Sequence, residues 1–216
     1  LAEQLDNEDD FLMNTVGLNV GADLTENVQA FVRIANERTL GSSNVNTAQG
    51  DIDISQGYVK IKELFYSPLD LTIGTQPIVW GRGFVLGSNL IPSIVAGADR
   101  NAAILADEFT DFTAFDAIRL SGDFGGTAAM DMPLTFDAVY IKSAEGTVGN
   151  PDDTNIMGVN LGTRFDTGEM ETYYLNKRDR SATTGENHGS VSTLGVRGSV
   201  QPDNGANVYG ELAYQF

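Results

Sequence analysis

Apolar and polar residues alternate with a period of two along most of this sequence. Such alternation is typical of β-strands that have one face in an apolar environment and the other in a polar one. The alternating segments are about 11 residues long, which exceeds the common strand of soluble proteins and matches a tilted strand that crosses a bilayer. Ten strands are predicted, at residues 11–22, 28–38, 53–64, 69–79, 114–124, 133–143, 154–165, 169–179, 189–200 and 206–216.

The connections between these strands are of two kinds, which alternate along the chain. Short turns follow the first, third, fifth, seventh and ninth strands, at residues 23–27, 65–68, 125–132, 166–168 and 201–205. The other connections are longer or richer in loop residues, and the longest spans residues 80–113. Short turns at one end and long loops at the other are typical of transmembrane β-barrels. We therefore predict one all-β domain over residues 1–216, an antiparallel up-and-down transmembrane β-barrel.

The two faces of most predicted strands differ in chemistry. In the fifth strand, Ile118 and Leu120 alternate with Arg119, and three other strands follow the same pattern. The eighth strand, at residues 169–179, does not show which of its faces is apolar. Charges buried in a dry core cost several kcal/mol each. The apolar stripe is therefore expected to meet lipid, and the charged stripe to line a water-filled lumen.

Aromatic residues gather near the ends of the predicted strands. Such rings favour the two membrane–water interfaces, where barrels carry aromatic girdles. The short-turn end has Phe65, Tyr66, Phe124, Phe165 and Tyr209, and the long-loop end has Trp80, Phe115, Tyr140 and Tyr214. Two girdles are predicted, with chance placement near strand ends as the alternative.

The directions of the outermost strands predict where the two chain ends lie. Strand 11–22 runs into a short turn and strand 206–216 leaves one, so both ends are expected on the long-loop side. Complete single-chain barrels have both termini on the side of the short turns. The chain is therefore expected to be an internal stretch of a larger barrel, with strands missing at both edges.

Residues 56–88 carry the most distinctive motif, QGYVKIKELFYSPLDLTIGTQPIVWGRGFVLGS. In it, a strand that contains Gln-x-Tyr and Lys precedes a strand that ends Gly-x-Gln and a glycine-rich turn. The residues of the motif are Gln56, Tyr58, Lys60, Gly74, Gln76, Gly81, Arg82, Leu86, Gly87 and Ser88. On these residues the chain resembles the bacterial alginate-export family of outer-membrane porins. The resemblance extends less distinctively over residues 11–216, and it implies a barrel of about 18 strands.

The resemblance also implies a pore that passes an anionic polysaccharide between arginines. The inward-facing basic candidates are Arg33, Lys60, Lys62, Arg82, Arg119, Arg164 and Arg197. The inward-facing acidic candidates are Glu37, Asp70, Asp123, Asp137 and Glu211. Because the two signs are mixed, two alternatives are open. One is an anion-selective funnel, and the other is a set of transverse rows of opposite charge at a constriction.

The long connection at residues 80–113 contains the apolar stretch LIPSIVAGA, at residues 90–98. Two alternatives are open for this loop as well. In the first, it folds into the pore as a constriction or plug. In the second, it packs on the rim of the barrel as a surface loop.

Composition argues against several other functions. The chain has no Cys, so it has no disulfides, thiolate metal sites or cysteine nucleophiles. Its net charge of −17 argues against a nucleic-acid partner, which requires a basic surface. The single histidine, His188, is expected to be solvated in a loop, so no enzyme activity and no cofactor are predicted. Acidic clusters between the strands are expected to be solvated, with calcium binding as the alternative.

These observations together predict a porin of a Gram-negative outer membrane. Its partners are the lipid bilayer and polar solutes that diffuse passively, anions and oligosaccharides among them. The alternative is a non-conducting outer-membrane or surface β-protein whose acidic loops bind a partner. A third hypothesis is a soluble β-sandwich, in which the apolar stripe packs against a second layer of the same molecule.

Overall fold

The computed structural model describes residues 12–40, 52–66, 68–87, 114–125, 133–144, 153–179, 189–202 and 205–216. Within them, ten strands form one antiparallel sheet in which each strand pairs with its neighbours in the sequence. The strands are β1 (Leu12–Asp23), β2 (Val28–Leu40), β3 (Asp53–Ile61), β4 (Leu69–Gln76), β5 (Phe115–Phe124), β6 (Leu134–Ala144), β7 (Thr154–Phe165), β8 (Gly168–Asp179), β9 (Gly189–Val200) and β10 (Val208–Gln215). The predicted all-β, antiparallel up-and-down arrangement is confirmed. None of the described segments is a helix long and apolar enough to cross a membrane.

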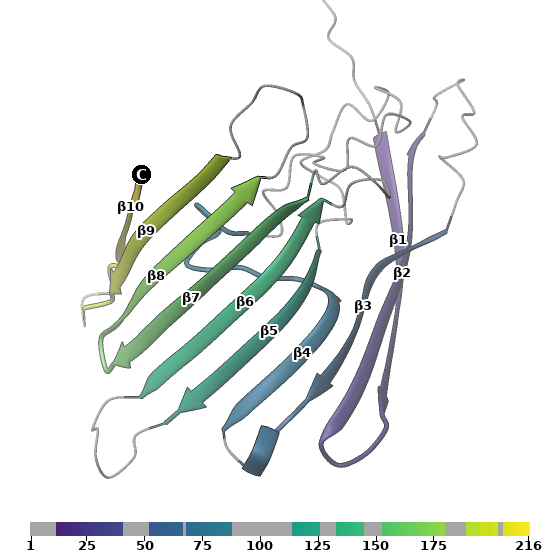
Figure 1. Cartoon of the computed structure of the whole chain (residues 1–216), viewed down its shortest axis with the longest axis horizontal. Coiled ribbons are helices and arrows are strands. Elements are labelled where there is room, and N and C mark those ends of the chain that lie inside the picture. Colours follow the sequence, from purple (N-terminus) through teal and green to yellow (C-terminus); the bar gives the residue numbers. More distant parts are fainter. Residues whose placement is uncertain are drawn as a thin grey trace, which may run out of the picture.

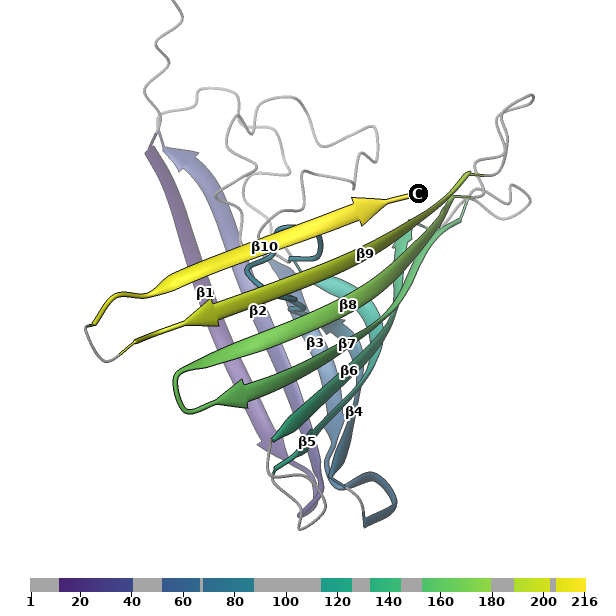
Figure 2. The same cartoon turned by 90° about the vertical axis from the view of Figure 1, so that its left-hand side faces the viewer.

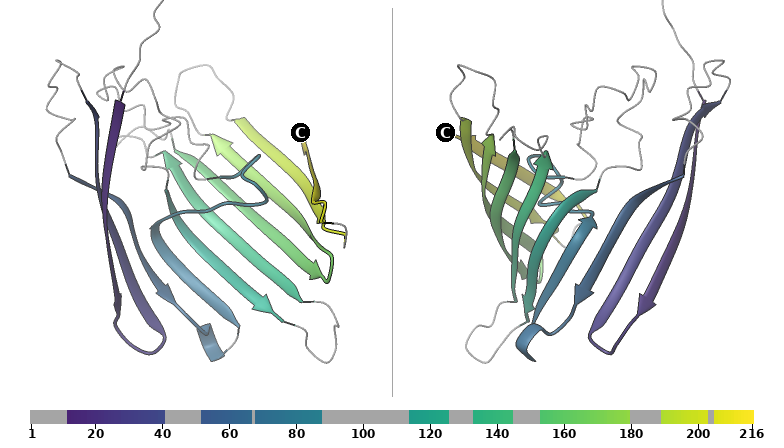
Figure 3. Two further views of the ribbon diagram at one scale, coloured as in Figure 1. Left: turned by 180° about the vertical axis from the view of Figure 1, so that it is seen from behind. Right: turned by 45° about the vertical axis from the view of Figure 1, so that its right-hand side comes forward.

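The sheet is strongly curved, so that it has a concave and a convex face (Figures 1 and 2). Figure 3 shows an open half-pipe, with β1 to β3 in one wall and β6 to β9 in the other. Strands β1 and β10 lie at the two margins of the sheet, and no pairing joins them within the described ranges.

The connections divide between the two ends of the half-pipe. The chain turns within residues 24–27 after β1 and within residues 166–167 after β7. The connection from β3 to β4 lies at the same end and contains a 3₁₀ turn at Leu64–Tyr66 (Figure 1). The chain leaves β2, β4, β6 and β8 at the opposite end, which matches the predicted division into a short-turn end and a long-loop end.

Strands β3 and β4 are shorter than the predicted ranges 53–64 and 69–79. After Ile61, the amide of Lys62 donates to the carbonyl of Asn27 in the neighbouring turn at 2.8 Å. Glu63 then has a φ of 52°, which ends the extended backbone. Lys62 therefore lies just beyond β3 rather than within it. Strand β4 ends at Gln76, because the chain there leaves the sheet and enters the concave space.

The convex face is apolar and uncharged along most of each strand. Cross-strand pairing sets Ile73, Ile118, Tyr140 and Met157 in one row on this face. Exposed large apolar residues of the convex face include Val16, Leu18, Val20, Val59, Ile73, Ile118, Tyr140, Met157, Val159, Leu161, Phe165, Met170, Tyr174, Leu194, Val196, Val200, Val208, Leu212 and Tyr214. The same face becomes polar toward the long-loop end, where it carries Asp116, Lys142, Asn155, Asn176 and Arg178.

The aromatic residues follow the predicted girdles only in part. Those exposed on the convex face include Tyr140, Phe165 and Tyr214. Trp80 is instead 2% exposed on the concave side, and Phe115 packs against the same buried cluster. Tyr209 also faces inward, with its ring against the guanidinium of Arg82. The predicted membership of these three rings in lipid-facing girdles is wrong, because a ring near a strand end can face either side of the sheet.

Candidate functional site

The chain enters the concave space at the end of β4, where two residues of the distinctive motif have structural roles. Gly74 has a φ of 125°, a conformation that favours glycine, and a Cβ at this position would overlap the carbonyl of Gly57. Gln76 is 2% exposed. Its Nε2 donates to the carbonyls of Thr72, Gly74 and Ala117 at 3.3, 3.4 and 3.1 Å. This side chain fixes the end of β4 to β5 at the point where the backbone leaves the sheet.

Residues 77–87, termed the inner loop, fold back on themselves inside the half-pipe (Figures 2 and 3). The amide of Trp80 donates to the carbonyl of Leu86 at 2.9 Å, and the amide of Gly83 donates to the carbonyl of Trp80 at 2.9 Å. Gly81 has a φ of 61°, which allows the tight reversal between them. The turn presents the Trp80 side chain to the concave face of the sheet.

A small apolar core anchors the inner loop to the sheet. Ile78, Trp80 and Leu86 are all at most 4% exposed. They belong to one buried cluster with residues of β5, β6 and β8, which are Ala117, Val139, Ile141, Tyr173 and Leu175. Because full burial of one large apolar side chain contributes about 1.5–3 kcal/mol, these three residues hold the inner loop firmly against the wall.

Two glycines on the facing strands leave room for the rings of this core. A Cβ at Gly158 of β7 would lie 2.9 Å from the ring of Trp80. A Cβ at Gly195 of β9 would overlap the ring of Tyr173. Both glycines lie on the inward face, so the bulk that the inner loop and β8 bring to this region is matched by small residues on β7 and β9.

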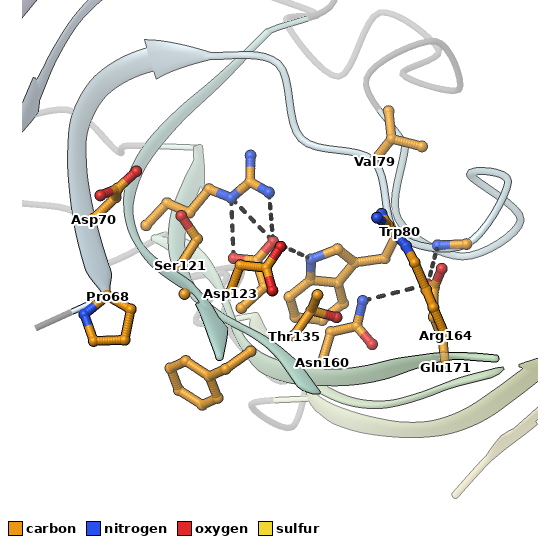
Figure 4. A pocket seen from close by; sticks show the side chains of 15 residues that line it. Pro68, Asp70, Val79, Trp80, Ser121, Asp123, Thr135, Asn160, Arg164 and Glu171 are labelled. Atoms are coloured by element: carbon orange, nitrogen blue, oxygen red, sulfur yellow. Dashed lines mark hydrogen bonds and ion pairs between the residues drawn. The ribbon is translucent and has the colours of Figure 1, made fainter. Parts of the chain in front are cut away.

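Three consecutive residues of the inner loop each donate a hydrogen bond to a carboxylate on a different strand. The bonds run from Trp80 Nε1 to Asp137 of β6 at 3.0 Å, from the amide of Gly81 to Glu171 of β8 at 3.0 Å, and from the amide of Arg82 to Glu211 of β10 at 3.4 Å. Figure 4 shows the first two of these contacts around the neighbouring cavity. The inner loop is thus tied to the concave face across β6 to β10.

The carboxylate that receives Trp80 also forms an ion pair. Arg119 of β5 donates through Nε to both oxygens of Asp137 at 3.0 Å, and through Nη2 to Oδ2 at 2.6 Å. Asp137 is 9% exposed and the side chain of Arg119 is 30% exposed, so the pair is partly buried. Loss of either partner would leave the other charge uncompensated in a partly buried position. The Arg119–Asp137 pair therefore fixes the wall and keeps an acceptor in place for Trp80.

A second ion-pair group joins β8 and β9. Arg197 is 7% exposed, and it donates through Nη1 to Glu171 at 2.7 Å and through Nη2 to Glu169 at 2.6 Å. The hydroxyl of Tyr173 donates to Glu211 Oε1 at 2.8 Å. The acids that hold the inner loop are thus themselves oriented by neighbouring side chains.

Several of the other predicted pore-lining residues lie on the β1 side of the sheet. Lys60 of β3 pairs with Asp70 of β4 at 2.7 Å. Arg33 of β2 donates through Nη1 to Asn19 of β1 at 3.4 Å. Glu37 lies on the same inward face of β2 as Arg33. The sheet order separates these residues of β2 from the cluster around the inner loop by β3 and β4.

Two cavities open on the concave face, and Arg164 of β7 lines both. One has a volume of about 400 Å³ and lies beside the inner loop (Figure 4), and the other has a volume of about 540 Å³ and adjoins the turn between β7 and β8. Arg164 is exposed and forms no hydrogen bond or ion pair with the rest of the described chain. Arg82 lies with its guanidinium 3.7 Å from the centre of the Tyr209 ring.

The sequence did not reveal the inward residues of β8, which include Glu169, Glu171 and Tyr173. Both faces of this strand carry polar and aromatic residues, and Tyr174 follows Tyr173 directly. The usable signal is that the two glutamates are two residues apart. Both glutamates must therefore lie on the same face of the strand. Of the two faces, the one that carries two charges is expected to be the face in contact with water.

Within the described residues, the concave face thus presents charged and hydrogen-bonding side chains, cavities, and the guanidinium groups of Arg82 and Arg164, which have no carboxylate partner there. His188, the apolar stretch 90–98 and most of the acidic clusters lie outside the described residues. Residues 88–113 also lie outside the described residues. The constriction or plug predicted for residues 80–113 therefore stays a prediction.

No family model matches the chain, and no curated protein matches it.

Proposed function

We propose that this chain forms part of the wall of a β-barrel channel in a Gram-negative outer membrane, through which polar solutes diffuse passively. In this proposal the curved sheet belongs to a closed barrel, the convex face meets lipid and the concave face lines a water-filled pore. The short turns lie in the periplasm and the long loops lie outside. The inner loop narrows the pore from one wall.

The observation that supports this proposal most strongly is the exposed apolar convex face. Soluble monomers rarely expose contiguous apolar patches larger than a few hundred Å². On this face, apolar side chains such as Leu161, Leu194 and Leu212 are exposed on strand after strand. No second layer packs over them in the part of the chain that the structure describes. Contact with acyl chains removes the cost of exposing this surface to water, whereas the soluble-sandwich hypothesis leaves it uncovered.

The polar edge of the convex face fits the boundary of a membrane. At the long-loop end, the hydroxyl of Tyr140 donates to Asn155 at 3.2 Å, and the hydroxyl of Tyr174 lies 3.0 Å from that of Ser192. Tyrosine favours the membrane–water interface because its ring is apolar and its hydroxyl is polar. These pairs would mark the level at which acyl chains give way to head groups.

The proposed solutes are small polar molecules, saccharides and anions among them. Most inward charges of the described strands are paired with opposite charges, so strong ion selectivity is not expected. Anion passage would depend on Arg164 and Arg82, whose guanidinium groups have no carboxylate partner in the described part of the chain. A relationship to the alginate-export family, and with it a barrel of about 18 strands, belongs to the same proposal.

Electrical recording from the full-length protein in a planar lipid bilayer tests the proposal. Stepwise single-channel currents are expected, and heat-denatured protein serves as the control. A protein that inserts but never conducts would contradict the channel and favour the non-conducting surface protein. A protein that stays monomeric in water without detergent would contradict the membrane location.

A further inference from the structure

The cavity of about 400 Å³ beside the inner loop has an unusual balance of charges. The ionisable residues that line it are Asp70, Arg119, Asp123, Asp137, Arg164 and Glu171. Most of these are paired: Arg119 with Asp137, Asp70 with Lys60, and Glu171 with Arg197. Asp123 and Arg164 form no ion pair or hydrogen bond with any other described residue. The cavity therefore offers a solute one carboxylate and one guanidinium.

We propose that this cavity is a subsite for a small zwitterion, a solute with one carboxylate and one ammonium group, such as an α-amino acid. The inference rests on the proposed channel function and names a solute class for it. Arg164 binds the carboxylate of the solute, and Asp123 binds its ammonium group. Guanidinium and carboxylate groups suit each other because two parallel N–H···O bonds form between them.

The register of the sheet places the two unpaired charges within reach of one small molecule. Asp123 of β5 pairs with Thr135 of β6, Thr135 pairs with Gly162 of β7, and Arg164 follows two residues later. With adjacent strands about 4.8 Å apart and a rise of about 3.4 Å per residue, the Cα atoms of Asp123 and Arg164 are about 12 Å apart. Both residues are on the concave face and line the same cavity, so a small solute in this cavity can contact both charges.

The residues of β6 and β7 that lie between the two charges have small or polar side chains. Gly162 has no side chain, and a Cβ there would overlap the hydroxyl of Thr135. Ser121 adds a second hydroxyl to the lining. Figure 4 shows Asp123 and Arg164 on opposite sides of the Trp80 side chain, which also lines the cavity.

The pair of opposite charges also disfavours solutes of a single sign. An anion at Arg164 lies near Asp123, and a cation at Asp123 lies near Arg164, so each attraction is offset by a repulsion. A zwitterion meets both charges favourably in one orientation. Specificity of this kind comes from the repulsive contacts as much as from the attractive ones.

Uptake of two matched solutes into proteoliposomes tests the subsite. The probes are L-alanine, a zwitterion, and L-lactamide, an uncharged molecule of the same size, both radiolabelled and at micromolar concentration. The wild-type protein should take up L-alanine faster. Arg164→Gln and Asp123→Asn should each lower the ratio of the two initial rates about two- to five-fold, the effect of one exposed charge contact. Arg164→Lys keeps the charge but not the two parallel hydrogen bonds, so its ratio should fall between those of the wild type and Arg164→Gln.

The matched controls are Arg178→Gln and Asp116→Asn, on the convex face of β8 and β5, which should leave the ratio unchanged. KCl conductance measured on each variant shows that it has inserted and is open. The subsite would be overturned if the wild-type protein took up both solutes at equal rates. It would also be overturned if neither Arg164→Gln nor Asp123→Asn changed the ratio of the rates. Neither result would contradict the proposed channel. Uptake of neither solute, together with no conductance, would overturn the channel itself.

Discussion

At the scale of single residues, Trp80 does most to hold the inner loop in place. Its ring lies in the buried core and its Nε1 donates to Asp137. An indole combines an apolar body with one donor, which suits a membrane interface as well as a cavity edged by a carboxylate. Residue type and position near a strand end therefore could not decide between a lipid-facing girdle and the interior. The deciding partners come from strands far away in the sequence.

Replacing this ring should release the inner loop. Trp80→Ala should lower the free energy of unfolding by about 3–5 kcal/mol, the usual cost of emptying a buried aromatic site. In the proposed channel it should also raise the single-channel conductance, because a detached inner loop would no longer narrow the pore. Phe84→Ala is the control, since Phe84 belongs to the same loop and is 64% exposed. Equal stability and conductance in the two variants would show that Trp80 does not anchor the loop.

At the scale of elements, the strands could be predicted because one physical pattern runs through them. Strands with one apolar and one polar face alternate apolar and polar side chains, and ten such segments were recognisable from the sequence. The ends of β3 and β4 could not be predicted. They depend on the contact of Lys62 with Asn27 and on the departure of the chain after Gln76. The faces of β8 were ambiguous because Tyr173 and Tyr174 give both faces an aromatic ring.

The fit between β8 and β9 gives a test at this scale. Gly195→Ala should lower the free energy of unfolding by about 1–3 kcal/mol, because the added methyl group overlaps the Tyr173 ring. Gly210→Ala on β10 is the control, since nothing lies within 4 Å of a Cβ there. Urea unfolding in lipid vesicles, followed by the fluorescence of the chain's single tryptophan, measures both. A tolerated Gly195→Ala would mean that Tyr173 does not lie over β9.

At the scale of the whole molecule, the two faces of the sheet differ in the medium that suits each of them. The convex face has an apolar band with a polar edge, and the concave face has ion pairs, cavities and the inner loop. The alternation in the sequence indicated that the faces differ. It could not place the inner loop against β5 to β10, because those contacts join residues 57 to 129 positions apart. Only the folded chain brings them together.

Site-directed spin labelling tests the division between the two faces most directly. The chain has no cysteine, so single substitutions on β5 can be labelled cleanly: Ile118→Cys and Leu120→Cys on the convex face, Ser121→Cys and Asp123→Cys on the concave face. In lipid vesicles, the convex labels should collide mainly with oxygen, which concentrates in acyl chains, and the concave labels mainly with a water-soluble nickel chelate. Convex labels that collide with nickel as often as the concave ones, or with neither reagent because protein covers them, would contradict a lipid-facing sheet around a wet interior.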